Sequence, residues 1–201
     1  MRDERVIGMA SEGTQAGRPK AGLPRFQAVV LRYVQFPIYC RFTSWKKAAA
    51  VFEAEGNKLI ALAHPLSPDL FQKTVQIGPL WGLEDNSRCW SAEMVLEHLI
   101  EVGSRIAIGI VELSHGEQPS VKADDLKPKG GHGLRLLKDY IAFLDDYAQT
   151  LLEDVGQKTS NLTHPHPWFG QLTAHGWACF GAVHLTVHRR QMERIVTGLE
   201  P

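Results

Sequence analysis

Four segments of this sequence repeat their apolar residues with the period of an α-helix. They cover about residues 44–63, 91–114, 137–151 and 173–196. Alternation of the strand kind is scarce apart from a short stretch at residues 27–34. The pattern therefore predicts an all-α fold, a four-helix bundle.

The connection between the second and third segments sets the expected helix order. Residues 115–132 are rich in Gly, Pro, Lys and Asp and lack apolar periodicity. A helix over 91–114 spans roughly 36 Å, and a fully extended connection of this length reaches roughly 60 Å, so the chain can return along the bundle. The second and third helices are then parallel, and we expect a long crossover between them.

The N-terminal part differs from the rest. Residues 1–22 are charged and Gly-rich without the apolar core of a signal peptide, and we expect a mobile tail. An aromatic-rich stretch follows, which Pro37 would interrupt or kink. We therefore divide the chain into an N-terminal tail and lead-in segment, 1–43, and a bundle domain, 44–201.

Composition narrows the classes of partner. Lys and Arg together number 22, as do Asp and Glu, so overall charge favours neither nucleic acid nor an anionic membrane as a partner. The expected partner is a small molecule or another subunit, and the latter would make a homodimer. The three cysteines, Cys40, Cys89 and Cys179, are odd in number and widely spaced, which predicts a cytoplasmic protein rather than a disulfide framework.

Two histidines one helical turn apart mark the fourth segment. His184 and His188 lie about 40° apart around a helix, so both imidazoles can reach one point beside it. A helical wheel puts both on the core-facing stripe with Trp177. In the second segment, His98 lies on an inward stripe as well, together with Val95.

Three inward histidines need partners. Each one alone fits a core histidine satisfied by a backbone carbonyl or a buried water. Three neutral imidazoles in one apolar pocket leave several nitrogens to satisfy, whereas one divalent cation takes three lone pairs. We therefore predict a metal site formed by His98, His184 and His188. Nitrogen ligands suit zinc, nickel, copper or iron rather than magnesium or calcium, and we expect zinc or nickel, with iron as an alternative.

The same residues carry a family resemblance. The C-terminal part resembles the signature of a DinB-like family, through His166-Pro167-Trp168-Phe169-Gly170-Gln171-Leu172-Thr173, Trp177, His184-Leu185, His188 and Gln191. The second segment resembles the other half of that signature, through Trp90-Ser91 and Leu96-Glu97-His98-Leu99. The resemblance covers about residues 44–197.

This DinB-like family is similar to the DinB/YfiT superfamily. The resemblance implies a bundle in up-down-down-up order with one metal ligand from the second helix and two from the fourth, here His98, His184 and His188. It also implies that a low-molecular-weight thiol is one option for a substrate, because some superfamily members are thiol-dependent transferases or isomerases.

Further residues are candidates for the surroundings of the metal. Gln191 returns to the azimuth of His184, so we expect its amide to hydrogen-bond a ligand or a bound water. Trp177 is expected at the pocket wall, and the loop that carries His164, His166 and Trp168 at its rim. The two loop histidines are candidates for acid–base groups beside the pocket, and a packed turn before the helix is the alternative role for them.

Charged residues near His98 give a weaker signal. Glu97 and Glu101 point away from the direction of His98 and are expected to be solvated or salt-bridged. Arg105 either anchors a substrate anion or pairs with Glu101. No general base stands out, so the catalytic residues stay unassigned.

These features predict a metal-dependent enzyme in which a metal-activated water or thiol attacks a small molecule, as in a hydrolase or a thiol transferase. A non-catalytic metal-binding or stress-associated helical bundle is the alternative. A helical interaction module whose histidines bind nothing is the third hypothesis.

Overall fold

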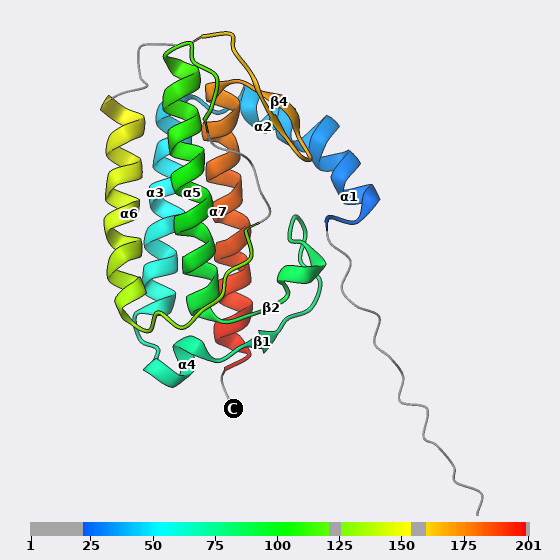
Figure 1. The fold of residues 1–201 in the computed structure, drawn as a ribbon. Coiled ribbons are helices and arrows are strands. Elements are labelled where there is room, and N and C mark those ends of the chain that lie inside the picture. The colour runs from blue at the N-terminus through cyan, green and yellow to red at the C-terminus, as the bar shows by residue number, and fades with distance from the viewer. Residues whose placement is uncertain (1–21, 121–125, 154–159, 200–201) are drawn as a thin grey trace, which may run out of the picture.

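The computed structural model describes residues 22–120, 126–153 and 160–199. Its main body consists of four long helices that lie side by side (Figure 1), namely α3 (Trp45–Ala63), α5 (Ala92–Ser114), α6 (Arg135–Glu153) and α7 (Ala174–Thr197). The predicted all-α four-helix bundle is confirmed.

Side-chain caps fix where three of these helices begin. The hydroxyls of Ser44, Ser91 and Thr173 each accept a hydrogen bond of 3.2 Å from the backbone N–H three residues further on. The predicted starts of these helices are therefore correct to within one residue. The sequence places Gly156 just past the end of α6, where a glycine is a common C-cap, but this residue lies outside the described ranges.

The helices follow the predicted order. Helices α3 and α7 run in one direction and α5 and α6 in the other (Figure 1), which is the up-down-down-up arrangement. Helices α3 and α5 each pack against both α6 and α7. Since α5 and α6 are parallel neighbours, the chain between them crosses back along the bundle, as the length of the connection predicts.

Two buried carboxylates hold the crossover against α5. Glu93 and Glu97, one turn apart, accept hydrogen bonds from five successive backbone N–H groups over residues 129–133. Gly130 and Gly131 have φ of 72° and 90°, the left-handed conformation that turns these N–H groups toward the helix. Glu97 is thus buried, which corrects the expectation that its carboxylate is solvated. Its carboxylate also lies 3.2 Å from Nε2 of His132, a contact that is a salt bridge when this imidazole is protonated.

The lead-in segment is helical, which corrects the strand-like reading of residues 27–34. Helix α1 (Arg25–Val30), a π-helical turn (Leu31–Gln35) and α2 (Phe36–Arg41) follow one another without a break. The π turn ends at Gln35, two residues before Pro37, whose ring cannot continue an ordinary helical hydrogen-bond ladder. Phe36 is buried with its ring centroid 4.4 Å from that of Phe169, so this segment packs onto the bundle.

Short elements complete the frame around the bundle. A small helix, α4 (Pro68–Gln72), follows α3, and a 3-10 turn (Asp85–Ser87) precedes α5. Two antiparallel pairs join β1 (Val75–Gln76) to β2 (Cys89–Trp90) and β3 (His164–His166) to β4 (Gly170–Leu172). Within the described ranges, none of the helices is both long and apolar enough to cross a membrane.

We predict that Glu97→Gln lowers the free energy of unfolding by about 1–3 kcal/mol, because a charged acceptor of buried N–H groups is lost. Burial alone would raise the pKa of Glu97, but hydrogen bonds from Gly130, Lys129 and His132 outweigh it and lower that pKa. The stabilisation is therefore present at neutral pH and is lost as the pH falls through the lowered pKa.

Urea unfolding of Glu97→Gln and wild type at neutral and acidic pH measures this difference. Glu101→Gln, on the next turn of α5 and exposed, is the matched control and should change stability by less than about 0.5 kcal/mol. Equal stability of Glu97→Gln and wild type at neutral pH would contradict the anchoring role.

Candidate metal centre

The structure brings together the three histidines that the sequence singles out. His98 comes from α5, and His184 and His188 come from successive turns of α7. Nε2 of His184 lies 3.2 Å from Nε2 of His98 and 3.1 Å from Nε2 of His188. One ligand atom from each residue lies within 4.8 Å of the other two, so the rings converge on one point.

Hydrogen bonds on the far side of two rings fix their tautomers. Nδ1 of His98 lies 3.0 Å from the carbonyl oxygen of Leu126, which can only accept, so this nitrogen carries the proton. Nδ1 of His188 lies 2.6 Å from Oε1 of Gln191, whose Nε2 donates to the carbonyl of Ser87 at 2.6 Å. Nε2 of His98 and Nε2 of His188 are therefore the unprotonated nitrogens of the neutral rings, and both face Nε2 of His184.

This donor set fits a divalent cation. The single proton of the neutral His184 imidazole cannot satisfy two facing lone pairs fully, whereas a cation accepts all three. Ligands at 2.0–2.1 Å in a tetrahedral zinc site stand about 3.3–3.4 Å apart, close to the two measured separations. Three imidazole nitrogens are the donors of a zinc, nickel, copper or iron site rather than of a magnesium or calcium site.

Burial favours the neutral form of the two α7 imidazoles. Desolvation, followed by the neighbouring histidines, lowers the pKa of His184 well below its ordinary value. Desolvation and then His98 lower the pKa of His188 to about 3, against the opposing effect of Gln191. Neutral imidazole is the form that binds a metal, so this environment prepares ligands at physiological pH.

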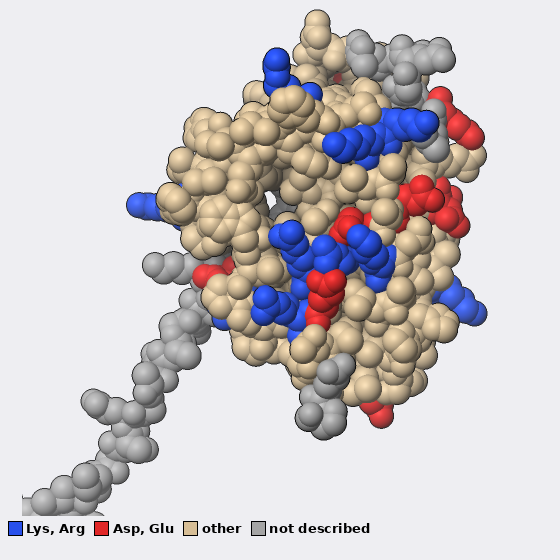
Figure 2. Space-filling view, turned by 180° about the vertical axis from the view of Figure 1, so that it is seen from behind, with Lys and Arg blue, Asp and Glu red and all other residues tan. Residues whose placement is uncertain are grey.

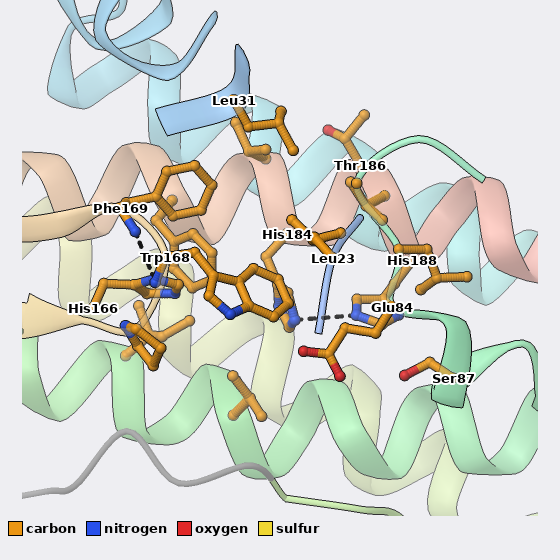
Figure 3. A pocket seen from close by; sticks show the side chains of 18 of the residues that line it. Leu23, Leu31, Glu84, Ser87, His166, Trp168, Phe169, His184, Thr186 and His188 are labelled. Carbon is orange, nitrogen blue, oxygen red and sulfur yellow. Dashed lines mark hydrogen bonds between the residues drawn. The ribbon is translucent and has the colours of Figure 1, made fainter. Parts of the chain in front are cut away.

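A cavity of about 740 Å³ adjoins the three histidines (Figure 3). Its wall includes Trp177, and the hairpin of β3 and β4 contributes His164, His166 and Trp168. The structure thus places the predicted pocket residues around one space. This cavity is large enough for a small organic molecule.

The loop histidine His166 follows the alternative reading. Its Nδ1 accepts hydrogen bonds from the backbone N–H groups of Trp168, at 3.1 Å, and Phe169, at 3.3 Å. Its ring packs against that of Phe180 with centroids 4.3 Å apart, and burial lowers its pKa to about 3. His166 therefore holds the turn that forms the pocket wall.

Gln191 takes the position that the helical wheel predicts. It is fully buried and joins His188 to the turn at residues 85–87 through its two amide atoms. One side chain therefore orients a candidate ligand and at the same time pins a loop at the cavity edge. Arg105 also lines the cavity, whereas Glu101 is exposed.

Sequence reasoning missed several residues of this site. Trp90 packs parallel to His188 with ring centroids 5.9 Å apart and lies 5.1 Å from the ring of His98. The carboxylate of Glu84 reaches into the cavity (Figure 3), and Leu31 of the lead-in segment lines it. Trp90 is part of the motif that carries the family resemblance, but no pattern in the sequence places it beside the histidines. Glu84 carries no periodic signal, because it precedes a 3-10 turn.

Fold and site together define a class of four-helix bundle with a histidine cluster that joins two helices. The sequence matches the DinB superfamily over residues 51–192, and the chain belongs to this superfamily.

One solved structure, described as the crystal structure of TT2238, a four-helix bundle protein, is 24% identical to this chain, with a TM-score of 0.49. The likeness covers 75% of this chain and 98% of that one. No curated protein matches the chain.

We predict that Gln191→Ala weakens zinc binding by roughly 10-fold to 100-fold, the range for partners that orient a metal ligand. The substitution frees Nδ1 of His188 to turn and leaves the carbonyl of Ser87 without this donor. Isothermal titration with zinc measures the effect, and Gln149→Ala, an exposed glutamine on α6, is the matched control. Unchanged affinity would show that Gln191 only packs the core.

Proposed function

We propose that His98, His184 and His188 bind one divalent metal ion and that this chain is a metal-dependent enzyme acting on a small molecule. One observation carries the proposal: three imidazole nitrogens converge at the wall of a 740 Å³ cavity. The histidines offer three ligands, and the cavity gives a substrate access to a fourth position.

The number of ligands favours an enzyme over a structural site. Structural zinc sites are closed by four protein ligands, whereas catalytic sites keep one position open. Among the described residues, no fourth His, Cys, Asp or Glu joins the cluster of three. Zinc or nickel is the expected metal, with iron as the alternative. When bound, such a metal supplies a Lewis acid and lowers the pKa of a coordinated water or thiol.

The cavity wall indicates the character of the substrate. Aromatic side chains dominate the wall near the histidines, among them Trp90, Trp168, Phe169, Trp177 and Phe180. Such walls bury apolar groups and leave orientation to a few polar atoms. We therefore expect a substrate with a sizeable apolar part, and a low-molecular-weight thiol is one option for the attacking group.

Glu84 is our candidate proton acceptor. Its side chain enters the cavity that the histidines line (Figure 3), but it does not belong to the cluster of ligand atoms within 4.8 Å. A carboxylate in this place can take a proton from a nucleophile beside the metal site without acting as a ligand.

Two hydrogen bonds of Ser87 hold the loop that carries Glu84. The backbone N–H of Ser87 donates to the carbonyl of Glu84 at 3.1 Å, and the carbonyl of Ser87 accepts from Gln191. Gln191 therefore positions both a candidate ligand and this carboxylate.

A non-catalytic metal-binding protein is the second candidate. The cluster joins α5 to α7, so a metal there would also staple two helices. The two functions differ in what metal removal does. If the site is catalytic, metal removal abolishes activity and the bundle stays folded. If the site is structural, metal removal unfolds the bundle.

We predict that His184→Ala abolishes metal binding and turnover while the bundle stays folded. Loss of one of three ligands should weaken zinc binding by more than about 100-fold, because even the loss of a residue that hydrogen-bonds to a ligand weakens metal binding by about 10-fold to 100-fold. The apolar stripes rather than the metal should supply most of the stability.

Zinc titration, circular dichroism and a screen of ester, amide and thiol-conjugation substrates measure these effects. His64→Ala removes an exposed histidine at the end of α3 and serves as the control. Unfolding of wild type on chelation, with no turnover of any substrate class, would instead assign a structural site.

We further predict that Glu84→Gln lowers kcat by about 10²-fold to 10⁴-fold, the usual contribution of a general base, and leaves zinc affinity unchanged. Glu53→Gln, an exposed glutamate on α3, is the control. Full activity with an unaltered pH profile would remove Glu84 from the mechanism.

A further inference from the structure

The outer side of the lead-in helix, residues 25–41, carries a concentration of exposed apolar side chains. We call this surface the outer face; it consists of Phe26, Val29, Tyr33, Val34 and Ile38 together with Phe42, the residue directly after the helix, each at least half exposed. Trp81 adjoins this surface, because its ring centroid lies 6.5 Å from that of Phe26. The other exposed large apolar residues of the described chain lie on other elements: Ile108, Leu134 and Ile141. Contiguous patches of this kind mark interaction sites.

The π-helical turn keeps these side chains on one side. The outer face steps from Phe26 to Val29 to Tyr33 at helical spacing, includes the adjacent Val34, and continues at Ile38, five residues after Tyr33. The wide step falls on Leu31–Gln35, where the π turn holds an extra residue per turn. The opposite side of the same helix packs inward, since Phe36 is buried there.

The charge of this region is one-sided, although the whole chain is balanced. No Asp or Glu occurs between Gly13 and Phe52. The described part of this stretch holds five basic side chains, all exposed: Arg25, Arg32, Arg41, Lys46 and Lys47. In Figure 2 the lobe formed by this segment is a largely uncharged surface beside a hollow, with basic side chains at its edges and acidic atoms of another segment at its lower edge.

This pattern does not suit a second copy of the chain. A two-fold dimer through the outer face would set the patch against itself. Arg25, Arg32 and Arg41 of both copies would then approach one another without an acidic residue in the segment to pair with them. A negatively charged partner with an apolar interior complements the face better.

We propose that the outer face docks onto an anionic membrane surface. A helix with aromatic and aliphatic residues on one side and basic residues around it lies in the interface of a bilayer, with its apolar side among the acyl chains. Anionic headgroups attract the flanking Arg and Lys. The chain would bind peripherally.

Docking would also bring the cavity close to the lipid. Leu31, Gln35 and Tyr39 of the same helix line the cavity next to the histidines. The inner side of the membrane-docking helix is thus part of the pocket wall. Binding to lipid does not depend on the metal site, so His184→Ala should bind as wild type does.

Cosedimentation of the full chain with vesicles tests the proposal. We expect binding to phosphatidylcholine vesicles that contain phosphatidylglycerol, weak binding to pure phosphatidylcholine, and weakening with salt. Val29→Ser/Tyr33→Ser/Ile38→Ser should abolish binding. Arg25→Gln/Arg41→Gln/Lys46→Gln should weaken it roughly 100-fold, at roughly five-fold for each charge.

Two control variants carry matched changes outside the lead-in helix. Ile108→Ser/Leu134→Ser/Ile141→Ser removes exposed apolar residues, and Lys73→Gln/Arg135→Gln/Lys138→Gln removes exposed charges. Both should bind vesicles like wild type, and circular dichroism checks the fold of every variant.

Three results would overturn the proposal. They are no binding of wild type to anionic vesicles, equal loss of binding in the control variants, or a concentration-dependent dimer that the apolar triple variant alone disrupts. The last result would assign the outer face to a second copy, and analytical ultracentrifugation detects it.

Discussion

Three imidazole nitrogens that face one another inside an apolar bundle are the arrangement on which the rest of this structure depends. His98 on α5 meets His184 and His188 on α7 only because these antiparallel helices pack directly at a fixed register. Neutral rings in this position bring lone pairs face to face at a partly buried site, which is costly without a cation or another donor. Burial lowers the pKa of the two α7 histidines, so protonation of these rings at neutral pH does not relieve the contact between the lone pairs.

Two segments far apart in sequence hold the rings in this orientation. The carbonyl of Leu126 in the crossover fixes His98, and the crossover itself is anchored to α5 by Glu93 and Glu97. Gln191 fixes His188 and pins the turn that carries Glu84. Nδ1 of His184 has no hydrogen-bond partner among the described residues. The site therefore depends on loop backbone as much as on the two helices.

Helical periodicity and caps were enough to predict the bundle. Apolar spacing, together with Ser44, Ser91 and Thr173, located helix starts because these signals are local. The parallel pair of helices followed from the length of one connection. The convergence of the three histidines followed from side-chain azimuths, which a helix fixes rigidly.

The features of the fold and of the site that the sequence did not predict depend on tertiary contacts, which a single sequence does not reveal. Residues 27–34 alternate like a strand but form a helix with apolar side chains on two sides. One side of this helix packs inward, and the other side is exposed. Glu97 resembled an ordinary surface glutamate until the crossover brought backbone N–H groups to it. Leu126 contributes through its carbonyl, which is independent of residue type, so no side-chain pattern could have pointed to it.

X-ray absorption spectroscopy of the zinc-loaded protein tests the central claim most directly. The fine structure reports the number, type and distance of the ligand atoms around the metal. Our account predicts three imidazole nitrogens at about 2.0–2.1 Å and one further light atom. His184→Ala should lose one imidazole from this shell. A shell with no more than one imidazole, or one unchanged by His184→Ala, would contradict the account.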